Sequence, residues 1–236
     1  MDNKAGIKFP RLRQARLQKR LNRFLAKVEL DGEIETAFIP NPGRLTELLY
    51  PGAGVYLRAV SPKNKRNTTY DLSLASCGNV LVSIDSRVPN LLVAEALVAN
   101  CLPWFKDYKI VRSEPRLGRS RLDFHLTAAG LAECFVEVKS CTLVREGMAS
   151  FPDAPTLRGS RHVEELLHLV SAGYRAAILF VVQREDAVSF TPNDSLDPLF
   201  GKSLRKAADG GVEVYAVKCR VNLEGINLSD WVPVIL

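Results

Sequence analysis

Two carboxylates and a lysine are the residues of this sequence whose types and spacing could do chemistry. Asp123 lies in one short strand-like segment, and Glu137 and Lys139 lie two residues apart in the next. Side chains in a strand alternate between its faces, so Glu137 and Lys139 are expected to share one face. Burying such a pair in a central strand is costly unless a cation or hydrogen bonds compensate for it.

A divalent cation would supply that compensation. Asp123 and Glu137, from neighbouring strands, could hold one Mg²⁺ (or Mn²⁺) through oxygen ligands. Lys139 could then orient or deprotonate a water, or stabilise the charge that grows on a phosphoryl group. Glu95, in the apolar segment before these strands, is either a further metal ligand or an exposed helix position. The set predicts phosphodiester hydrolysis, and the alternative is a surface Glu–Lys pair, because Glu-x-Lys triplets are common.

A second cluster follows, in residues 151–162, and leads directly into a predicted helix. Arg158, Ser160 and Arg161 could cradle a phosphate together with local N–H groups. Arg158 and Arg161 are three residues apart and would share a helix face. The alternative is a capping loop with solvated charges. His162 is interpreted as a capping or packing residue, not as a base.

The net charge of +6 is unevenly distributed. Residues 1–85 hold 14 Lys and Arg against 8 Asp and Glu, whereas residues 86–236 hold 18 of each kind. Lys4 to Lys27 contains nine basic residues and no acidic one. Such a segment favours a polyanionic partner, most simply DNA, with Arg13, Lys19 and Arg23 as phosphate contacts. The alternative is a basic face that only aids solubility.

The cysteines and the hydropathy of the sequence indicate the cellular compartment in which the protein is expected. The five cysteines are an odd number with no Cys-x-x-Cys pair, which favours free thiols in a reducing compartment. No apolar run reaches the roughly 18 residues that a spanning helix needs, and no apolar segment of a signal peptide follows the charged N-terminus. A cytoplasmic protein without a membrane span is expected. The sequence leaves the oligomeric state open, a homo-oligomer included.

The first part of the chain reads as short strands separated by turns. Asp31-Gly32 between two strand-like runs predicts a hairpin, although the stretch from Leu17 to Val28 also fits helical spacing. Pro40 to Gly43 is a turn, and Arg44 to Leu49 is a candidate short helix. Five strands with one helix suggest a small β-barrel such as an OB-fold, with strands expected at residues 24–30, 33–39, 54–60, 69–75 and 80–84.

The second part changes character near Pro89-Asn90 and alternates helices with strands. Helices are expected at 91–102, 161–172 and 196–208, the first with Asn90 as its N-cap. Strands are expected at 108–113, 121–126, 134–139, 176–182 and 212–217. The continuous apolar run at 176–182 predicts a strand covered on both faces. The result is an α/β (α+β) protein with a barrel in residues 1–85 and a mixed sheet flanked by helices in residues 86–236.

Four segments resemble the sugar fermentation stimulation protein family, SfsA, over nearly the whole chain. Two are specific: Phe-Val-Glu-Val-Lys-Ser-Cys-Thr-Leu at 135–143 and Phe-Pro-Asp-Ala-Pro-Thr-Leu-Arg-Gly-Ser-Arg-His at 151–162. The others are Ser-Arg-Leu-Asp-Phe at 120–124 and Pro-Asn-Pro-Gly-Arg-Leu at 40–45. Pro42 departs from the family pattern, which has Thr there. Leu122 stands where a nuclease motif often has Pro.

The resemblance implies an OB-like N-terminal domain and a C-terminal domain of the PD-(D/E)xK nuclease type. Asp123, Glu137 and Lys139 would take the positions of the nuclease motif. The family is described as binding DNA without marked sequence preference and as linked to the regulation of sugar metabolism. Two alternatives stay open: a DNA-binding regulator that keeps the nuclease fold without activity, and an oligosaccharide- or protein-binding module, since OB-folds also do that.

Overall fold

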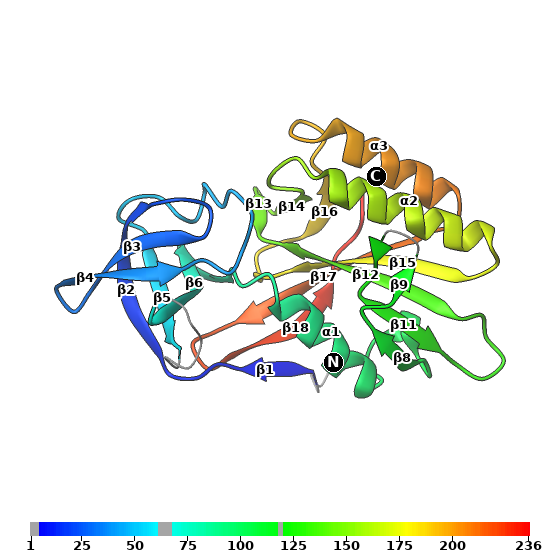
Figure 1. The fold of residues 1–236 in the computed structure, drawn as a ribbon, viewed down its shortest axis with the longest axis horizontal. Coiled ribbons are helices and arrows are strands. Elements are labelled where there is room, and N and C mark those ends of the chain that lie inside the picture. Colours follow the sequence, from blue (N-terminus) through cyan, green and yellow to red (C-terminus); the bar gives the residue numbers. More distant parts are fainter. Residues whose placement is uncertain (1–4, 61–67, 118–119) are drawn as a thin grey trace.

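The computed structural model describes residues 5–60, 68–117 and 120–236, and these form two parts that lie side by side (Figure 1). One part is a β-barrel, and the other is a seven-stranded sheet with helices on both faces. Lys4, the first residue of the basic segment, lies outside the described residues. The mixed α/β class with an OB-like barrel and a helix-flanked sheet is confirmed.

The barrel is formed by strands paired in the order β4-β3-β2-β5-β6-β7. A further pairing of β4 with β6 closes five of them into a ring. Their bounds are Leu12–Arg20 (β2), Leu25–Leu30 (β3), Glu33–Phe38 (β4), Gly54–Ala59 (β5), Tyr70–Cys77 (β6) and Val80–Ser83 (β7). Asp31 and Gly32 both have positive φ in the β3–β4 turn, as a two-residue hairpin of this kind requires.

Two features of the barrel differ from the expectation. The stretch with ambiguous spacing, from Leu17 to Val28, forms the end of β2 and the start of β3, and β2 was not among the expected strands. In β2, Ala15 and Leu17 are buried between exposed polar neighbours, which is the period of a strand. Arg44 to Leu49 does not form a helix, so that prediction was wrong. The N–H groups of Leu48 and Leu49 both donate to the carbonyl of Leu45, which makes a single turn with positive φ at Leu45.

The large sheet has the order β1-β18-β17-β15-β12-β11-β8, with β12, β15 and β17 parallel. Its bounds are Gly6–Lys8 (β1), Lys109–Ser113 (β8), Phe124–Thr127 (β11), Cys134–Cys141 (β12), Arg175–Val182 (β15), Glu213–Val221 (β17) and Gly225–Trp231 (β18). Strand β1 pairs with β18, so the chain starts on this sheet before it enters the barrel. The sequence predicted that all of residues 1–85 belong to the barrel, whereas Gly6–Lys8 belongs to the large sheet.

Helices cover the two faces of the sheet (Figure 1). Helix α1 (Val88–Val98) packs on the face that carries Val136 and Val138, while α2 (Leu157–Ser171) and α3 (Pro198–Asp209) pack on the other. Helix α1 begins at Val88 with Pro89 in its first turn, three residues before the expected start. Short elements complete the part: η1 (Pro103–Phe105), β9 (Arg116–Leu117), β10 (Ser120–Arg121), β13 (Leu143–Arg145), β14 (Met148–Phe151) and β16 (Ser189–Pro192).

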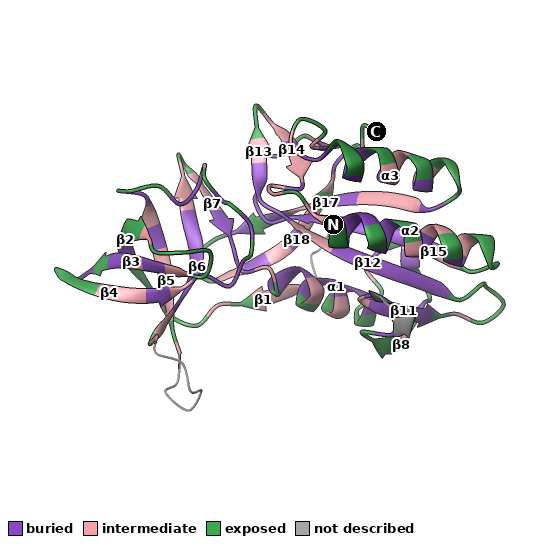
Figure 2. Ribbon diagram, turned by 45° about the horizontal axis from the view of Figure 1, so that its top comes forward, coloured by how far each residue is buried: buried purple, intermediate pink, exposed green. Residues whose placement is uncertain are grey.

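The centre of the sheet is the most buried part of the molecule (Figure 2). All residues from Ala176 to Val182 are buried, which confirms a strand covered on both faces. Strand β12 is buried from Cys134 to Val138 and then becomes partly accessible at Lys139 and Ser140. Glu137 and Lys139 therefore lie where β12 passes from a fully buried stretch to one that solvent can partly reach.

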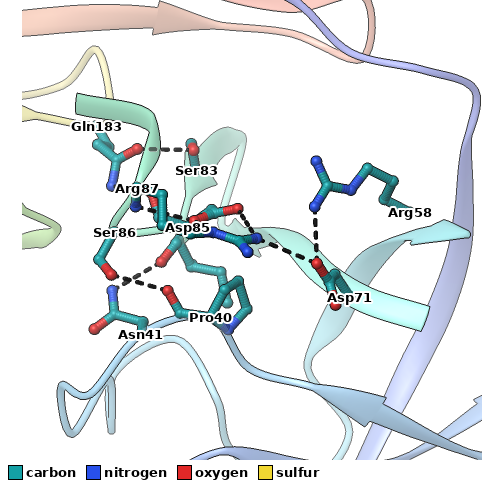
Figure 3. A network of polar contacts seen from close by, with 10 residues as sticks. Pro40, Asn41, Arg58, Asp71, Ser83, Asp85, Ser86, Arg87 and Gln183 are labelled. Carbon is teal, nitrogen blue, oxygen red and sulfur yellow. Dashed lines mark hydrogen bonds and ion pairs between the residues drawn. The ribbon is translucent and has the colours of Figure 1, made fainter. Parts of the chain in front are cut away.

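The two parts are joined by buried hydrogen bonds (Figure 3). Ser83, the last residue of β7, donates from Oγ and from its backbone N–H to Gln183, at 2.9 and 3.0 Å. Gln183 is fully buried at the end of β15. The guanidinium of Arg87 pairs with the buried carboxylates of Asp85 and Asp71. These contacts fix the barrel against the end of the central strands, next to the candidate site.

None of the helices in the described part of the chain is long and apolar enough to cross a membrane. All five cysteines are free thiols, and Cys134, Cys141 and Cys219 are buried.

Candidate active site

Asp123 is held between the sheet and helix α1. It directly precedes β11, which pairs with β12 so that Phe124 lies opposite Val136. The backbone N–H of Val138 donates to Oδ2 of Asp123 at 2.7 Å, and Nδ2 of Asn90 on α1 donates to Oδ1 at 2.6 Å. The strand pairing thus brings Asp123 beside the strand that carries Glu137.

Glu137 is 3% exposed and uses only one of its two oxygens. Its Oε1 accepts from Nζ of Lys139 at 2.5 Å and also contacts Nδ1 of His162 on α2. Its Oε2 is buried and has no hydrogen-bond partner among the described residues. A buried carboxylate oxygen without a partner is expensive, so this atom calls for a ligand.

The two carboxylates differ in protonation behaviour. Burial raises the pKa of Asp123 to about 7, and the charge of Glu137 adds to the rise. Burial alone would also raise the pKa of Glu137, but Lys139 and His162 outweigh it and hold that pKa below its ordinary value. Near neutral pH the site therefore holds an ionised Glu137 beside an Asp123 that is poised to lose its proton.

These residues fit a hard divalent cation. Asp123 and Glu137 supply oxygen donors, and the unpartnered Oε2 of Glu137 is an atom that a cation would satisfy. The described part of the chain contains no cluster of three or more His, Cys, Asp or Glu suited to a metal. Mg²⁺ usually binds through one or two carboxylates and keeps several waters, so two protein carboxylates are enough for it.

His162 connects Glu137 to the surface through Arg158. Nε of Arg158 donates to Nε2 of His162 at 3.3 Å, and Nζ of Lys139 lies 3.4 Å from Nδ1 of the same ring. A guanidinium can only donate, so Nε2 accepts and the ring proton lies on Nδ1, facing Glu137. We assign this Nδ1–H tautomer from the hydrogen-bond network. The ring then holds Glu137 in one orientation.

Comparison with known proteins identifies the family. The sequence model described as the sugar fermentation stimulation protein RE domain matches residues 87–225, and the SfsA N-terminal OB domain matches residues 19–84. This chain belongs to the sugar fermentation stimulation protein family. A homolog from Moorella thermoacetica is 50% identical over 91% of this chain and 93% of its own length. One from Desulforamulus reducens is 44% identical over 98% of this chain and 95% of its own.

The fold is also that of a solved SfsA structure. The SfsA protein of Pyrococcus furiosus, solved in complex with Ca²⁺, superposes with a TM-score of 0.91 at 31% identity. The similarity covers 98% of both chains. The architecture of barrel and helix-flanked sheet is therefore shared along the whole length of the SfsA chain.

Some of the expected site residues are not brought together. Glu95 is exposed on α1, because it lies five residues after Asn90 and so is turned by about 140° around the helix axis. The structure does not group it with Asp123 and Glu137. Arg161 is exposed on α2, and Arg158 alone of the two arginines contacts the site.

The basic residues predicted to contact DNA differ in whether they form an ion pair. Arg13 forms an ion pair with Asp31 and donates to the hydroxyl of Tyr70 at 2.7 Å. Lys19 and Arg23 are exposed at the other end of β2 and have no ion pair within the described ranges.

Sequence reasoning missed two residues of this site. Asn90 was expected to cap a helix, but the helix begins before it and its amide holds Asp123. His162 was expected to cap or pack, and it contacts Glu137 instead. A polar residue on the inner face of an amphipathic helix is the signal that marks His162, since its neighbours Val163 and Leu166 are buried against the same sheet.

Proposed function

We propose that this SfsA protein binds DNA without sequence preference and hydrolyses phosphodiester bonds at Asp123, Glu137 and Lys139 with the help of Mg²⁺ or Mn²⁺. The observation that carries the proposal is the buried, unpartnered Oε2 of Glu137 beside a second buried carboxylate. The Pyrococcus furiosus relative was solved in complex with Ca²⁺, which is also a hard cation that takes oxygen ligands.

Each residue has a distinct role in this proposal. Asp123 and Glu137 would be the protein ligands of the cation, which when bound activates water and polarises a phosphoryl oxygen. Lys139 would not be a ligand, because an ammonium group has no lone pair to offer a cation; it donates to Glu137 at 2.5 Å. From there it can orient the attacking water or stabilise charge on the phosphoryl group. Arg158, exposed at the start of α2, would hold a backbone phosphate.

DNA is the partner that the charge distribution supports. The surplus of basic residues lies in the first 85 residues of the chain, which contain every strand of the barrel and also β1 of the large sheet. Lys19 and Arg23 are exposed there. Contacts to phosphates position a protein on DNA but carry no sequence information, so binding without marked sequence preference is expected.

The test is incubation of the protein with single- and double-stranded DNA in Mg²⁺, Mn²⁺ or EDTA. Cleavage is expected with either metal and not with EDTA. Lys139→Ala should still show a metal-induced rise in melting temperature but no cleavage, while Lys202→Ala, on the exposed side of α3, should behave as wild type. DNA binding without any metal binding by calorimetry at millimolar Mn²⁺ would leave a non-enzymatic DNA-binding regulator.

A further inference from the structure

A cavity of about 510 Å³ lies between the barrel and the C-terminal part. From the barrel side it is lined by Arg23 and the turn from Asn41 to Gly43, and from the other side by Ser140 and Arg158. Arg158 donates to His162, which in turn contacts Glu137, while Ser140 follows Lys139 on the other face of β12. The cavity therefore opens beside the candidate active site.

The cavity continues over the barrel surface. A second hollow, of about 440 Å³, shares Arg23, Pro42 and Gly43 with the first and also contains Arg20 and Arg44. Because the two hollows have lining residues in common, they lie next to each other on this surface. We call them together the junction groove; it extends from Arg44 on the barrel to Arg158 beside the active site.

The junction groove carries an excess of positive charge. Arg23, Arg44 and Arg158 are exposed and have no ion pair within the described part of the chain. Arg20 is also without an ion pair there and donates to backbone carbonyls. Asp153 is the one carboxylate among the described lining residues, and it accepts a hydrogen bond from the N–H of Leu45. An anionic ligand fits such a groove.

Two hydroxyl groups of the groove are set to donate to that anion. Oγ of Ser140 accepts from Nε2 of Gln183 at 2.9 Å, and Oγ1 of Thr156 accepts from the N–H of Gly159 at 3.0 Å. Each oxygen thus already uses a lone pair within the protein, and among the described residues neither hydroxyl donates its own proton, which can go to another acceptor. Phosphate oxygens are acceptors only, so they match both the arginines and these hydroxyls.

We propose that the junction groove binds one strand of DNA and leads it to Asp123 and Glu137, so that the substrate is single-stranded or has a frayed end. This inference rests on the proposed function for the nature of the site. The cavity has the size of a small-molecule pocket, which is large enough for a nucleotide of one strand and too small to enclose a duplex. Arginines spaced along a groove are a common way to follow a single-stranded backbone.

The test measures binding alone, with the full chain in EDTA, so that it does not depend on cleavage. The probes are a labelled single-stranded oligonucleotide and a blunt hairpin duplex of the same length. Arg23→Ala and Arg44→Ala should each weaken single-strand binding about tenfold and lower the log–log salt slope by about 0.7. Duplex binding should stay within about twofold, and Lys202→Ala should change neither.

The outcomes separate this inference from the proposed function. Unchanged single-strand binding by both variants, or an equal loss for strand and duplex, would overturn the groove even if the protein cleaves DNA. Melting temperatures near that of wild type confirm that the variants fold. Selective loss of single-strand binding supports the groove whether or not the metal site proves active.

Discussion

Nδ2 of Asn90 donates a 2.6 Å hydrogen bond to Oδ1 of Asp123 and so ties the first turn of α1 to the candidate metal site. The same carboxylate accepts from the N–H of Val138 on its other oxygen. Asp123 is thus held from a helix and from a strand at once. Partners of this kind orient a metal ligand, and their loss typically costs 10- to 100-fold in affinity.

Asn90→Ala should therefore weaken metal binding by about tenfold while the fold is kept. The hydrogen bond from Asn90 favours the ionised form of Asp123, so its loss should raise the pKa of Asp123 further. Calorimetric titration with Mn²⁺ measures the effect. Asn79→Ala, in the exposed turn between β6 and β7, is the matched control. Equal metal affinity in wild type and Asn90→Ala would show that Asn90 has no part in orienting Asp123.

The pH dependence of stability should reveal Asp123 in the absence of metal. Its pKa is about 7 in the folded protein, above the ordinary value of 3.8. Folding stability from this group is present at low pH and is lost as pH rises from about 4 through 7, because the unfolded chain ionises first. Asp123→Asn cannot ionise at this position, so its stability should not fall over this pH range. Its unfolding free energy should therefore exceed that of wild type at pH 8 by up to about 4 kcal/mol.

Chemical denaturation at pH 5 and pH 8 in EDTA checks this expectation. Asp209→Asn, at the exposed end of α3, is the matched control and should show no such difference. Addition of Mg²⁺ should raise the stability of wild type and not of Asp123→Asn, since a ligand stabilises only the state that binds it. The expectation fails if wild type and Asp123→Asn keep the same stability difference at both pH values.

The sequence predicts the centre of this site well because strand periodicity is a local property. Glu137 and Lys139 are two residues apart, and that spacing alone places them on one face, opposite Val136 and Val138. The placement of Asp123 beside them also follows from two consecutive antiparallel strands. These relations need no knowledge of how the distant elements pack.

The parts that the sequence did not predict depend on non-local packing or on mixed signals. Strand β1 pairs with β18 across nearly the whole chain, and no local pattern encodes that pairing. In β2 only Ala15 and Leu17 are buried, and the exposed basic residues around them make the alternation of buried and exposed positions hard to recognise. The contact of His162 with Glu137 joins α2 to β12 over 25 residues, and it depends on how the helix is rotated on the sheet.

His162 should act as a positioning residue for Glu137. The substitution His162→Gln removes the ring that links Glu137 to Arg158. The amide of the glutamine can still donate to one oxygen of Glu137. We expect metal affinity to fall several-fold, and the weaker hold on Glu137 to appear as a higher metal requirement for cleavage. His168→Gln, on the same helix but away from the site, is the control. A loss of stability in His162→Gln without any change in metal affinity would indicate a purely structural role.

The two ends of β2 should contribute differently to DNA binding. Arg13 is paired with Asp31, so a phosphate must displace that partner before it gains the contact. Lys19 is exposed and without an ion pair among the described residues, and its counterions are released when it meets a phosphate. Lys19→Ala should therefore lower the salt slope of single-strand binding by about 0.7, whereas Arg13→Ala should lower it by less than half as much. Affinity measured by fluorescence anisotropy over a series of salt concentrations, in EDTA, gives both slopes. A larger change for Arg13→Ala than for Lys19→Ala would place the DNA at the Asp31 end of the barrel, away from the junction groove.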